Sequence, residues 1–315
     1  MEWANRLSDM GHETGLYCSR TVRRPEWFRL KDSVPVFNTR RQLEKYDTWI
    51  ICSPHDIRLA RVRPSKKVSV FLFLQMREDL FRPDDRKWQE LCQEFYDNCY
   101  PLITISKWIF QDLRKMFPSR GPMKIVSNGV NLRDFPLEPG CRKDSATILV
   151  EGWNALNPTK DVDRIAPRVA SILKQRGYRI LAYSQTPLKD YPDAADGFYC
   201  LPTIEELNFL YRRASILLKA SRFDARSCSP MEAMTKGTVT VRAIEKGDDD
   251  LCGWYNCVRV PYDFQALLAG AETLLGSSQL WEKLSVECLK YVEKNSWDRS
   301  MPRIEELLRC PSAWY

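Results

Sequence analysis

The chain has 315 residues, of which 44% are hydrophobic and 28% charged, with 13 glycines and 19 prolines. This composition is that of ordinary globular proteins and argues against a disordered, collagen-like or coiled-coil chain. The length is enough for two compact domains. The longest apolar stretch, 68–74, is far shorter than the roughly 20 residues needed to cross a bilayer, so we expect no membrane-spanning segment.

The cysteines and histidines argue against stabilisation by disulfides or metals. Eleven cysteines are scattered along the chain without a Cys-x-x-Cys pair, and there are only two histidines, His12 and His55. A disulfide framework, a zinc clip and a histidine-rich metal site are therefore disfavoured. Residues 1–11 have the pattern of an amphipathic helix and not that of a secretion signal. We expect a cytoplasmic protein that holds no metal.

The net charge of +7 is unevenly distributed. Residues 1–136 hold 24 Lys and Arg against 17 Asp and Glu, whereas residues 137–315 hold 24 of each. The imbalance is greatest in residues 20–67, with 13 basic against 5 acidic side chains. Such a surface attracts anions such as phospholipid, a phosphorylated acceptor or nucleic acid, although a solvated basic face without a partner gives the same pattern.

The first part of the chain alternates short β-rich runs with helical patterns, which is typical of a parallel sheet flanked by helices. Helices are predicted at 85–99 and 107–116. The predicted strands are 15–19, 34–37, 48–52, 68–74, 102–105 and 124–127.

The second part repeats this rhythm. A helix follows Lys160, with Asp161 as its N-cap and its end at Gly177, and from Asp263 the chain is mostly helical, finishing with 298–308. The predicted strands are 146–151, 179–184, 197–200, 214–220, 238–242 and 257–260.

These patterns predict two doubly wound α/β domains. The segment 135–140, rich in Pro and Gly, is the natural linker, so the division falls between residues 1–136 and 137–315. Open parallel sheets bind ligands at the carboxyl ends of their strands, and two such domains place a cleft between them. We therefore expect a two-domain enzyme that binds its substrates in this cleft.

The segment 214–237 carries the most chemical information. A buried strand runs into a polar loop that contains Asp224, and a helix begins near Cys228 with Pro230 in its first turn and Glu232 one turn further on. Amides at a helix start can receive phosphate oxygens, and a carboxylate nearby can accept hydrogen bonds from ribose hydroxyls. From spacing alone, an acidic pair that simply caps the helix fits equally well.

This segment resembles the retaining GT-B glycosyltransferases of the large family-4 (group 1) type. Their hallmark is an acidic residue, seven further residues, and then Glu followed by Ala-Met-Ala-x-Gly. Asp224, Glu232 and the run Glu-Ala-Met-Thr-Lys-Gly at 232–237 match it, with Asp in place of the more usual Glu. The resemblance implies two Rossmann-like domains facing a cleft, with a nucleoside-diphosphate sugar as co-substrate and no other cofactor.

Further segments fit the same family in the same order. Residues 148–152 followed by Lys160 resemble the strand, glycine loop and lysine that hold the donor diphosphate, although Trp153 stands where many members have a basic residue. The resemblance implies that Lys160 neutralises the diphosphate, that Asp224 holds sugar hydroxyls and that Glu232 holds the ribose. The expected donor-binding residues are Gly152, Trp153, Lys160, Arg222, Arg226, Ser227, Cys228, Ser229 and Glu232.

His55 joins Asp224 and Lys160 as a catalytic candidate. It follows the predicted strand 48–52 and so lies at the carboxyl end of that strand, where a side chain can face the cleft. An ordinary loop histidine on the surface is the alternative.

The beginning of the chain departs from the family pattern. Residues 2–13 resemble the family's first helix and the turn after it, but members carry a strand and a glycine-rich loop ahead of that helix. We therefore expect a first domain without its initial strand and loop. That loop normally lies by the donor phosphates, so its absence leaves the activity open.

Three alternatives remain. A metal-dependent GT-A enzyme needs an Asp-x-Asp site, but the candidates 161–163 and 248–250 begin a helix and lie in a charged loop. A non-catalytic nucleotide-sugar or nucleic-acid binding protein derived from such an enzyme is a second reading. The acceptor also has two candidates, a lipid-linked or cell-surface glycan at a membrane face and a DNA base.

The resemblance also implies a mechanism. The family's retaining mechanism is front-face attack, in which the leaving phosphate helps to take the acceptor's proton.

Overall fold

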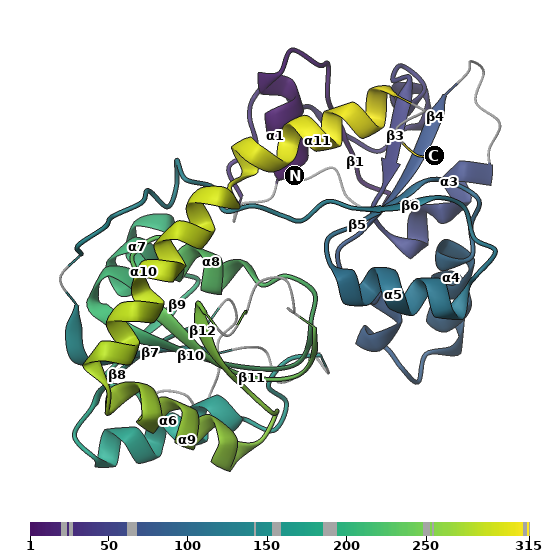
Figure 1. Cartoon of the computed structure of the whole chain (residues 1–315). Helices are drawn as coiled ribbons and strands as arrows, with labels where there is room; N and C mark the ends of the chain where they lie inside the picture. Colours follow the sequence, from purple (N-terminus) through teal and green to yellow (C-terminus); the bar gives the residue numbers. More distant parts are fainter. Residues whose placement is uncertain are drawn as a thin grey trace.

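A computed structural model gives the architecture of the protein. It describes residues 1–19, 24, 28–61, 68–141, 143–152, 159–184, 194–247, 253, 255–310 and 314. Two groups of parallel strands, each covered by helices, form two domains that lie side by side (Figure 1). Within the described ranges, no helix is both long and apolar enough to cross a membrane.

The first domain contains a four-stranded parallel sheet and a separate pair of short parallel strands. The pair is β1 (Leu16–Tyr17) with β2 (Val36–Phe37), and the sheet order is β3 (Thr48–Ile51), β4 (Ser69–Leu74), β5 (Leu102–Thr104) and β6 (Met123–Ile125). All six predicted strands are present, although β1 and β2 have only two residues each. The helices are α1 (Glu2–Asp9), α2 (Arg40–Leu43), α3 (Ile57–Arg61), α4 (Arg86–Tyr96) and α5 (Lys107–Met116), with 3-10 turns η1 (Pro54–Asp56) and η2 (Glu78–Phe81).

The second domain is built on one six-stranded parallel sheet. Its order is β9 (Gly197–Cys200), β8 (Arg179–Ser184), β7 (Asp144–Gly152), β10 (Ala214–Asp224), β11 (Val239–Gly247) and β12 (Cys257–Val260). This is the strand order 3-2-1-4-5-6 of the Rossmann fold, whose topological switch point lies between β7 and β10. The predicted doubly wound domain is confirmed. Its helices are α6 (Ile165–Gln175), α7 (Ile204–Arg213), α8 (Cys228–Met234), α9 (Phe264–Leu275) and α10 (Ser278–Lys294).

Strands β10 and β11 extend beyond the rest of this sheet. They were predicted to end at 220 and 242, but they continue to Asp224 and Gly247. The pairing of β10 with β7 ends at Leu218, whereas β10 and β11 continue to pair with each other up to the Asp224–Gly247 position. Because each strand satisfies the backbone groups of the other, the two can leave the sheet as a ribbon. The ribbon carries Asp224 toward the first domain, whose core takes up Ala225.

Helix α6 begins later than predicted. Asp161 was expected to be its N-cap, but the helix starts at Ile165 after Arg164, which has a left-handed φ of 52°. Asp161 still caps it, since its two carboxylate oxygens accept hydrogen bonds of 2.8 Å from the backbone amides of Ile165 and Ala166. In the first Asp-x-Asp candidate, 161–163, the carboxylate of Asp161 is therefore engaged in capping the helix. The second candidate, 248–250, lies outside the described residues.

The last helix, α11 (Trp297–Arg309), crosses from the second domain to the first (Figure 1). It matches the predicted helix 298–308, but it does not stay with the domain 137–315 to which the sequence assigned it. Its buried side chains Trp297, Met301, Ile304 and Leu307 belong to the core of the first domain. The amphipathic pattern fixes which face of α11 is apolar, and the break at Ser296 between α10 and α11 lets that face reach the other core.

Candidate donor-sugar site

The site lies at the switch point of the second domain. Gly152 ends β7, and the neighbouring strand β10 ends at Asp224, so both stand at the carboxyl edge of the sheet where doubly wound folds bind ligands. The segment before α6 lies against the same edge, because the amide of Phe223 donates a 2.9 Å hydrogen bond to the carbonyl of Thr159. This bond places Lys160 beside Asp224.

Three side chains form what we call the Asp224 cluster: Asp224, Lys160 and Arg242. The Lys160 Nζ and the Arg242 Nη2 each lie 3.0 Å from the same oxygen, Asp224 Oδ2. Burial by itself would raise the pKa of Asp224, but the positive charges of Lys160, Arg242 and Lys219 outweigh it and lower that pKa well below its ordinary value. Asp224 is therefore an ionised carboxylate held by two cations.

A second group, the Glu151 cluster, lies beside it and joins β7, β10 and α8. Lys219 on β10 is fully buried, and its ammonium contacts Glu151 Oε2 and, at 3.1 Å, Ser229 Oγ. The hydroxyl of Ser229 also donates to Glu151 Oε2. Burial lowers the pKa of Lys219, and the carboxylate of Glu151 opposes that effect. This cluster fixes the first turn of α8 against the sheet, so the expected donor residue Ser229 has a structural partner.

Glu232 lies on α8 and is partly exposed. Its Oε2 accepts a 3.0 Å hydrogen bond from the hydroxyl of Tyr211, which lies 3.1 Å from the hydroxyl of Tyr183. Burial raises the pKa of Glu232 to about 7, although the bond from Tyr211 acts in the opposite direction. The carboxyl group is therefore fixed at one oxygen and titrates near neutral pH.

The two predicted donor arginines have other partners. Arg226 is buried, and it donates to the carbonyl of Asn128 at 2.7 Å and to Asn295 Oδ1 at 3.0 Å, so it ties two loops together. Arg222 points away to a half-exposed ion pair with Glu245 at 3.0 Å. The structure thus leaves Lys160 as the predicted cation that lies at the Asp224 turn.

The remaining predicted residues fall in different places. Ser227 is buried and precedes α8, whereas Cys228 is exposed at the start of this seven-residue helix. Trp153 lies outside the described residues. His55 lies on η1 in the first domain, where its ring packs 4.7 Å from the ring of Trp88. The Asp224 cluster is built without His55.

The first domain contacts the Asp224 turn through α5. The indole Nε1 of Trp108 donates a 3.1 Å hydrogen bond to the carbonyl of Asp224. Gly247, which has φ 112°, completes this contact, since a Cβ there would lie 1.7 Å from that carbonyl oxygen and 2.9 Å from Trp108 Nε1. The backbone of Asp224 is therefore held by the first domain and its side chain by the second.

A polar chain extends from this contact into the first domain. Lys246 Nζ lies 2.7 Å from Asp112 Oδ2, and Arg77 Nη1 lies 3.1 Å from the same oxygen. Arg77 also grips Asp79 with two nitrogens, at 2.8 and 2.6 Å, and Asp79 Oδ1 accepts a 2.8 Å hydrogen bond from the hydroxyl of Tyr96. These five residues form what we call the Asp79 chain.

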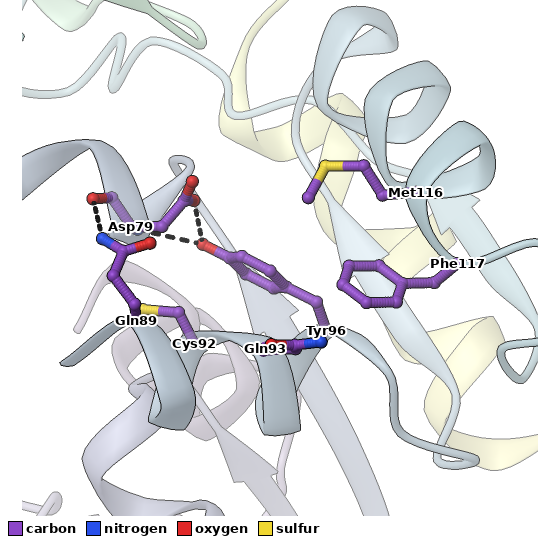
Figure 2. Close-up of a pocket in the computed structure, with 7 residues that line it drawn as sticks. All are labelled: Asp79, Gln89, Cys92, Gln93, Tyr96, Met116 and Phe117. Atoms are coloured by element: carbon purple, nitrogen blue, oxygen red, sulfur yellow. Dashed lines mark hydrogen bonds between the residues drawn. The ribbon is translucent and has the colours of Figure 1, made fainter. Parts of the chain in front are cut away.

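A small pocket lies at the far end of the Asp79 chain (Figure 2). Figure 2 shows the Tyr96 hydroxyl and the Gln89 amide both turned toward Asp79. Asp79 therefore accepts hydrogen bonds from both of these side chains. The pocket is lined by Asp79, Gln89, Cys92, Gln93, Tyr96, Met116 and Phe117.

Sequence reasoning missed several residues of this site, namely Glu151, Lys219, Arg242 and Trp108. One signal was available for the first three. Each is the one charged residue in a short run of mostly apolar residues, namely 148–151, 216–220 and 239–243. A charge in such a position is buried and requires a partner. Trp108 gave no comparable signal, because its partner is a backbone carbonyl 116 positions away.

Comparisons with known proteins identify the fold. Neither a protein-family model nor a curated protein sequence matches the chain. Sucrose-phosphate synthase from Thermosynechococcus elongatus matches with a TM-score of 0.79 over 98% of this chain and 91% of that one, at 14% identity. WaaG, a glycosyltransferase involved in lipopolysaccharide biosynthesis, matches with a TM-score of 0.67 over 98% and 94%, at 15% identity.

A third solved structure is HepE of Anabaena in complex with UDP and glucose. It matches with a TM-score of 0.64 over 87% of this chain and 85% of that one, at 14% identity. At these identities the likeness is one of fold. The chain has the GT-B glycosyltransferase fold, as the sequence predicted.

Proposed function

We propose that this protein is a retaining glycosyltransferase that moves a sugar from a nucleoside-diphosphate donor to an acceptor. The observation that carries the proposal is the position of the Asp224 carboxylate. It lies at the switch point of a Rossmann-like sheet, beside Lys160, and the helix that follows it, α8, carries Glu232. Solved structures of the same fold include WaaG, a glycosyltransferase, and HepE, which is in complex with UDP and glucose.

In the proposed reaction the bond between the anomeric carbon and the diphosphate oxygen breaks, and a bond to the acceptor oxygen forms on the same face. The electron pair of the broken bond goes to the diphosphate, whose oxygen takes the acceptor's proton. Lys160 meets the negative charge that grows on the diphosphate, Asp224 holds sugar hydroxyls near the positive ring, and Glu232 holds the ribose. Because Lys160 supplies the counter-charge, we propose that the reaction needs no metal.

We propose an anionic acceptor, and a lipid-linked or cell-surface glycan before a DNA base. The support is the basic excess of residues 20–67, with 13 Lys and Arg against 5 Asp and Glu. A cytoplasmic membrane face carries negative charge that attracts such a segment. Binding to vesicles that contain anionic lipid supports the glycan, whereas binding to duplex DNA that weakens steeply with salt supports the base.

The donor is tested by a thermal-shift screen with UDP-, GDP-, ADP- and dTDP-sugars, followed by a turnover assay with each donor that stabilises the protein. A ligand at a hundredfold excess over its Kd adds about 2.7 kcal/mol to the free energy of unfolding, which raises Tm measurably. We expect one nucleotide class to raise Tm and the Asp224→Asn protein to keep that binding while losing turnover. A panel without any stabilising nucleotide sugar contradicts the proposal.

A second function, a non-catalytic nucleotide-sugar binding protein, is favoured by one observation. The carboxylate of Asp224 is shared by Lys160 and Arg242, as in an ion pair that serves only stability. Binding of a nucleotide sugar without hydrolysis or transfer, in the presence of membrane or DNA acceptors, would identify this second function.

A further inference from the structure

The two cations of the Asp224 cluster differ in how firmly they are held. Lys160 lies in the segment ahead of α6, at the edge of the site, and 12% of its side chain is exposed. Arg242 lies on β11, which pairs with β10 on one side and β12 on the other, and its side chain is fully buried. A lysine on its flexible stem can turn to another anion, whereas a guanidinium inside a sheet stays in place.

From this difference, and on the basis of the proposed function, we propose that Arg242 is a positioning residue. It keeps the Asp224 carboxylate ionised and in place when Lys160 turns to the diphosphate of the donor. Lys160 carries one charge, so it cannot neutralise the diphosphate and remain the chief partner of Asp224 at once. The second cation 3.0 Å from the same oxygen removes that conflict.

Lys219 also lowers the pKa of Asp224, but less than Lys160 or Arg242 does. Lys219 on the same strand is engaged by Glu151 of β7 and by Ser229 of α8. Glu232 of α8 is acidic and adds no positive charge. Without both Lys160 and Arg242, the burial of Asp224 would favour the neutral acid, whose oxygens accept hydrogen bonds from sugar hydroxyls more weakly than those of a carboxylate.

The first experiment needs no nucleotide, because Lys160→Met imitates the departure of the lysine. The pH dependence of Tm is measured for full-length Lys160→Met and for Lys160→Met with Arg242→Met, each against the same protein carrying Asp224→Asn. This reference removes the titration of every other group. The difference between the two curves then reports the protonation of Asp224 alone.

We expect the Lys160→Met difference to be flat between pH 5 and pH 8, because Arg242 keeps the folded-state pKa below the unfolded one. With Arg242→Met added, the folded pKa rises above the unfolded one. Stability is then greatest at low pH and falls as the pH rises, by up to about tenfold in the folding equilibrium per pH unit until the raised pKa is passed.

Two results would overturn the proposal. One is a falling difference in Lys160→Met itself, which means that Arg242 does not hold the carboxylate. The other is a flat difference in the double variant, which means that another group holds it. If the double variant does not fold, the Lys160→Met curve still decides, and Lys160→Met with Arg242→Lys provides the charge-conserving comparison, which is expected to be flat.

Titration of UDP by calorimetry in buffers of different ionisation enthalpy separates this proposal from the proposed function. We expect UDP binding to Arg242→Met to take up about one more proton than binding to the original chain, because Asp224 protonates as Lys160 leaves. Asp224→Asn in the same protein should abolish that uptake. Failure of the original chain to bind UDP or another nucleotide counts against the proposed function, while the Tm curves still decide the role of Arg242.

Discussion

The molecule contains two networks of acidic and basic side chains that differ in their balance of charge. One consists of the Glu151 and Asp224 clusters of the second domain, and the other is the Asp79 chain of the first domain. In the Asp79 chain, Arg77 and Lys246 meet Asp79 and Asp112, and the chain ends at Lys246, whose side chain is 46% exposed. In the second domain, the described side chains place three cations, Lys160, Lys219 and Arg242, against Asp224 and Glu151, and two of those cations are fully buried.

The difference in charge indicates that the Asp79 chain stabilises the fold, whereas the Asp224 and Glu151 clusters can bind an anion. Buried charges are tolerated only when they are paired, and the one positive charge by which the Asp224 and Glu151 clusters exceed their own carboxylates can be balanced by a bound diphosphate. The Asp79 chain has no such excess among its own members, and it bridges two domains. The variants below test whether stability and activity divide between the two networks in this way.

The largest effect is expected from Lys219→Met. The change leaves the Glu151 carboxylate buried without its cation, which lowers the free energy of unfolding by about 3–5 kcal/mol. Urea unfolding followed by tryptophan fluorescence measures the loss. The double variant Glu151→Gln with Lys219→Met should regain most of it, and a double variant as unstable as the single one would contradict the assigned pair.

Asp224→Asn is expected to lower donor turnover by about 100- to 1000-fold, the loss seen when one preorganised electrostatic group is removed from an active site. Asp79→Asn is the matched control, since it makes the same change in the network of the first domain. We expect it to lower Tm while turnover with a saturating donor stays within about threefold. Equal losses of turnover in the two variants would show that the networks are not functionally distinct.

Donor affinity should depend on pH through Glu232, whose pKa is raised to about 7 by burial. The ionised carboxylate accepts hydrogen bonds from ribose hydroxyls and the neutral acid does so poorly, so UDP affinity should rise by up to about tenfold from pH 6 to pH 8. Glu232→Gln is the control, because it retains the titration of the phosphate itself. An unchanged pH dependence in Glu232→Gln would remove Glu232 from the ribose site.

The same carboxyl group gives a prediction for stability. Its folded pKa lies above that of the unfolded chain, so its contribution is fully present below the unfolded value, near 4.3, and is lost as the pH rises toward 7. Glu232→Gln should therefore flatten the fall of Tm over this range. The measurement needs no nucleotide, so it is independent of the donor.

The smallest effect is expected from Trp108→Phe, which removes the hydrogen bond to the carbonyl of Asp224 but keeps an aromatic ring. A bond of this kind contributes about 0.5–1.5 kcal/mol, so we expect turnover to fall roughly two- to tenfold. Trp88→Phe is the matched control, because the indole of Trp88 also donates to a carbonyl, that of Glu78, at 2.7 Å. Equal turnover in the two variants would argue that the first domain does not position Asp224.

The parts that the sequence could predict are those decided by local pattern. The helix Lys107–Met116 was predicted to the residue because its apolar positions follow the helical period, and the motif that contains Asp224 and Glu232 is contiguous. The partners of Asp224 were not accessible in this way. Arg242 reaches it through the register of β11 on β10, and Lys219 meets Glu151 across 68 positions of sequence.

The destination of α11 was unpredictable for a related reason. A helical pattern states how wide an apolar face is but not which core receives it. The decision comes from the turn at Ser296 and from contacts such as that of His12 Nε2 with Glu305 Oε1 at 2.8 Å. Both depend on the first domain being present beside the helix.

The crossing of α11 has a consequence for biosynthesis. A nascent chain emerges from the ribosome N-terminus first, and the domain synthesised first ordinarily folds first. Here the core of residues 1–136 also requires Trp297, Met301, Ile304 and Leu307, which are translated after every strand of the second domain's sheet. The first domain therefore reaches its final packing only after the six-stranded sheet of the second domain has been synthesised, and until then the apolar side chains that α11 covers lack these partners.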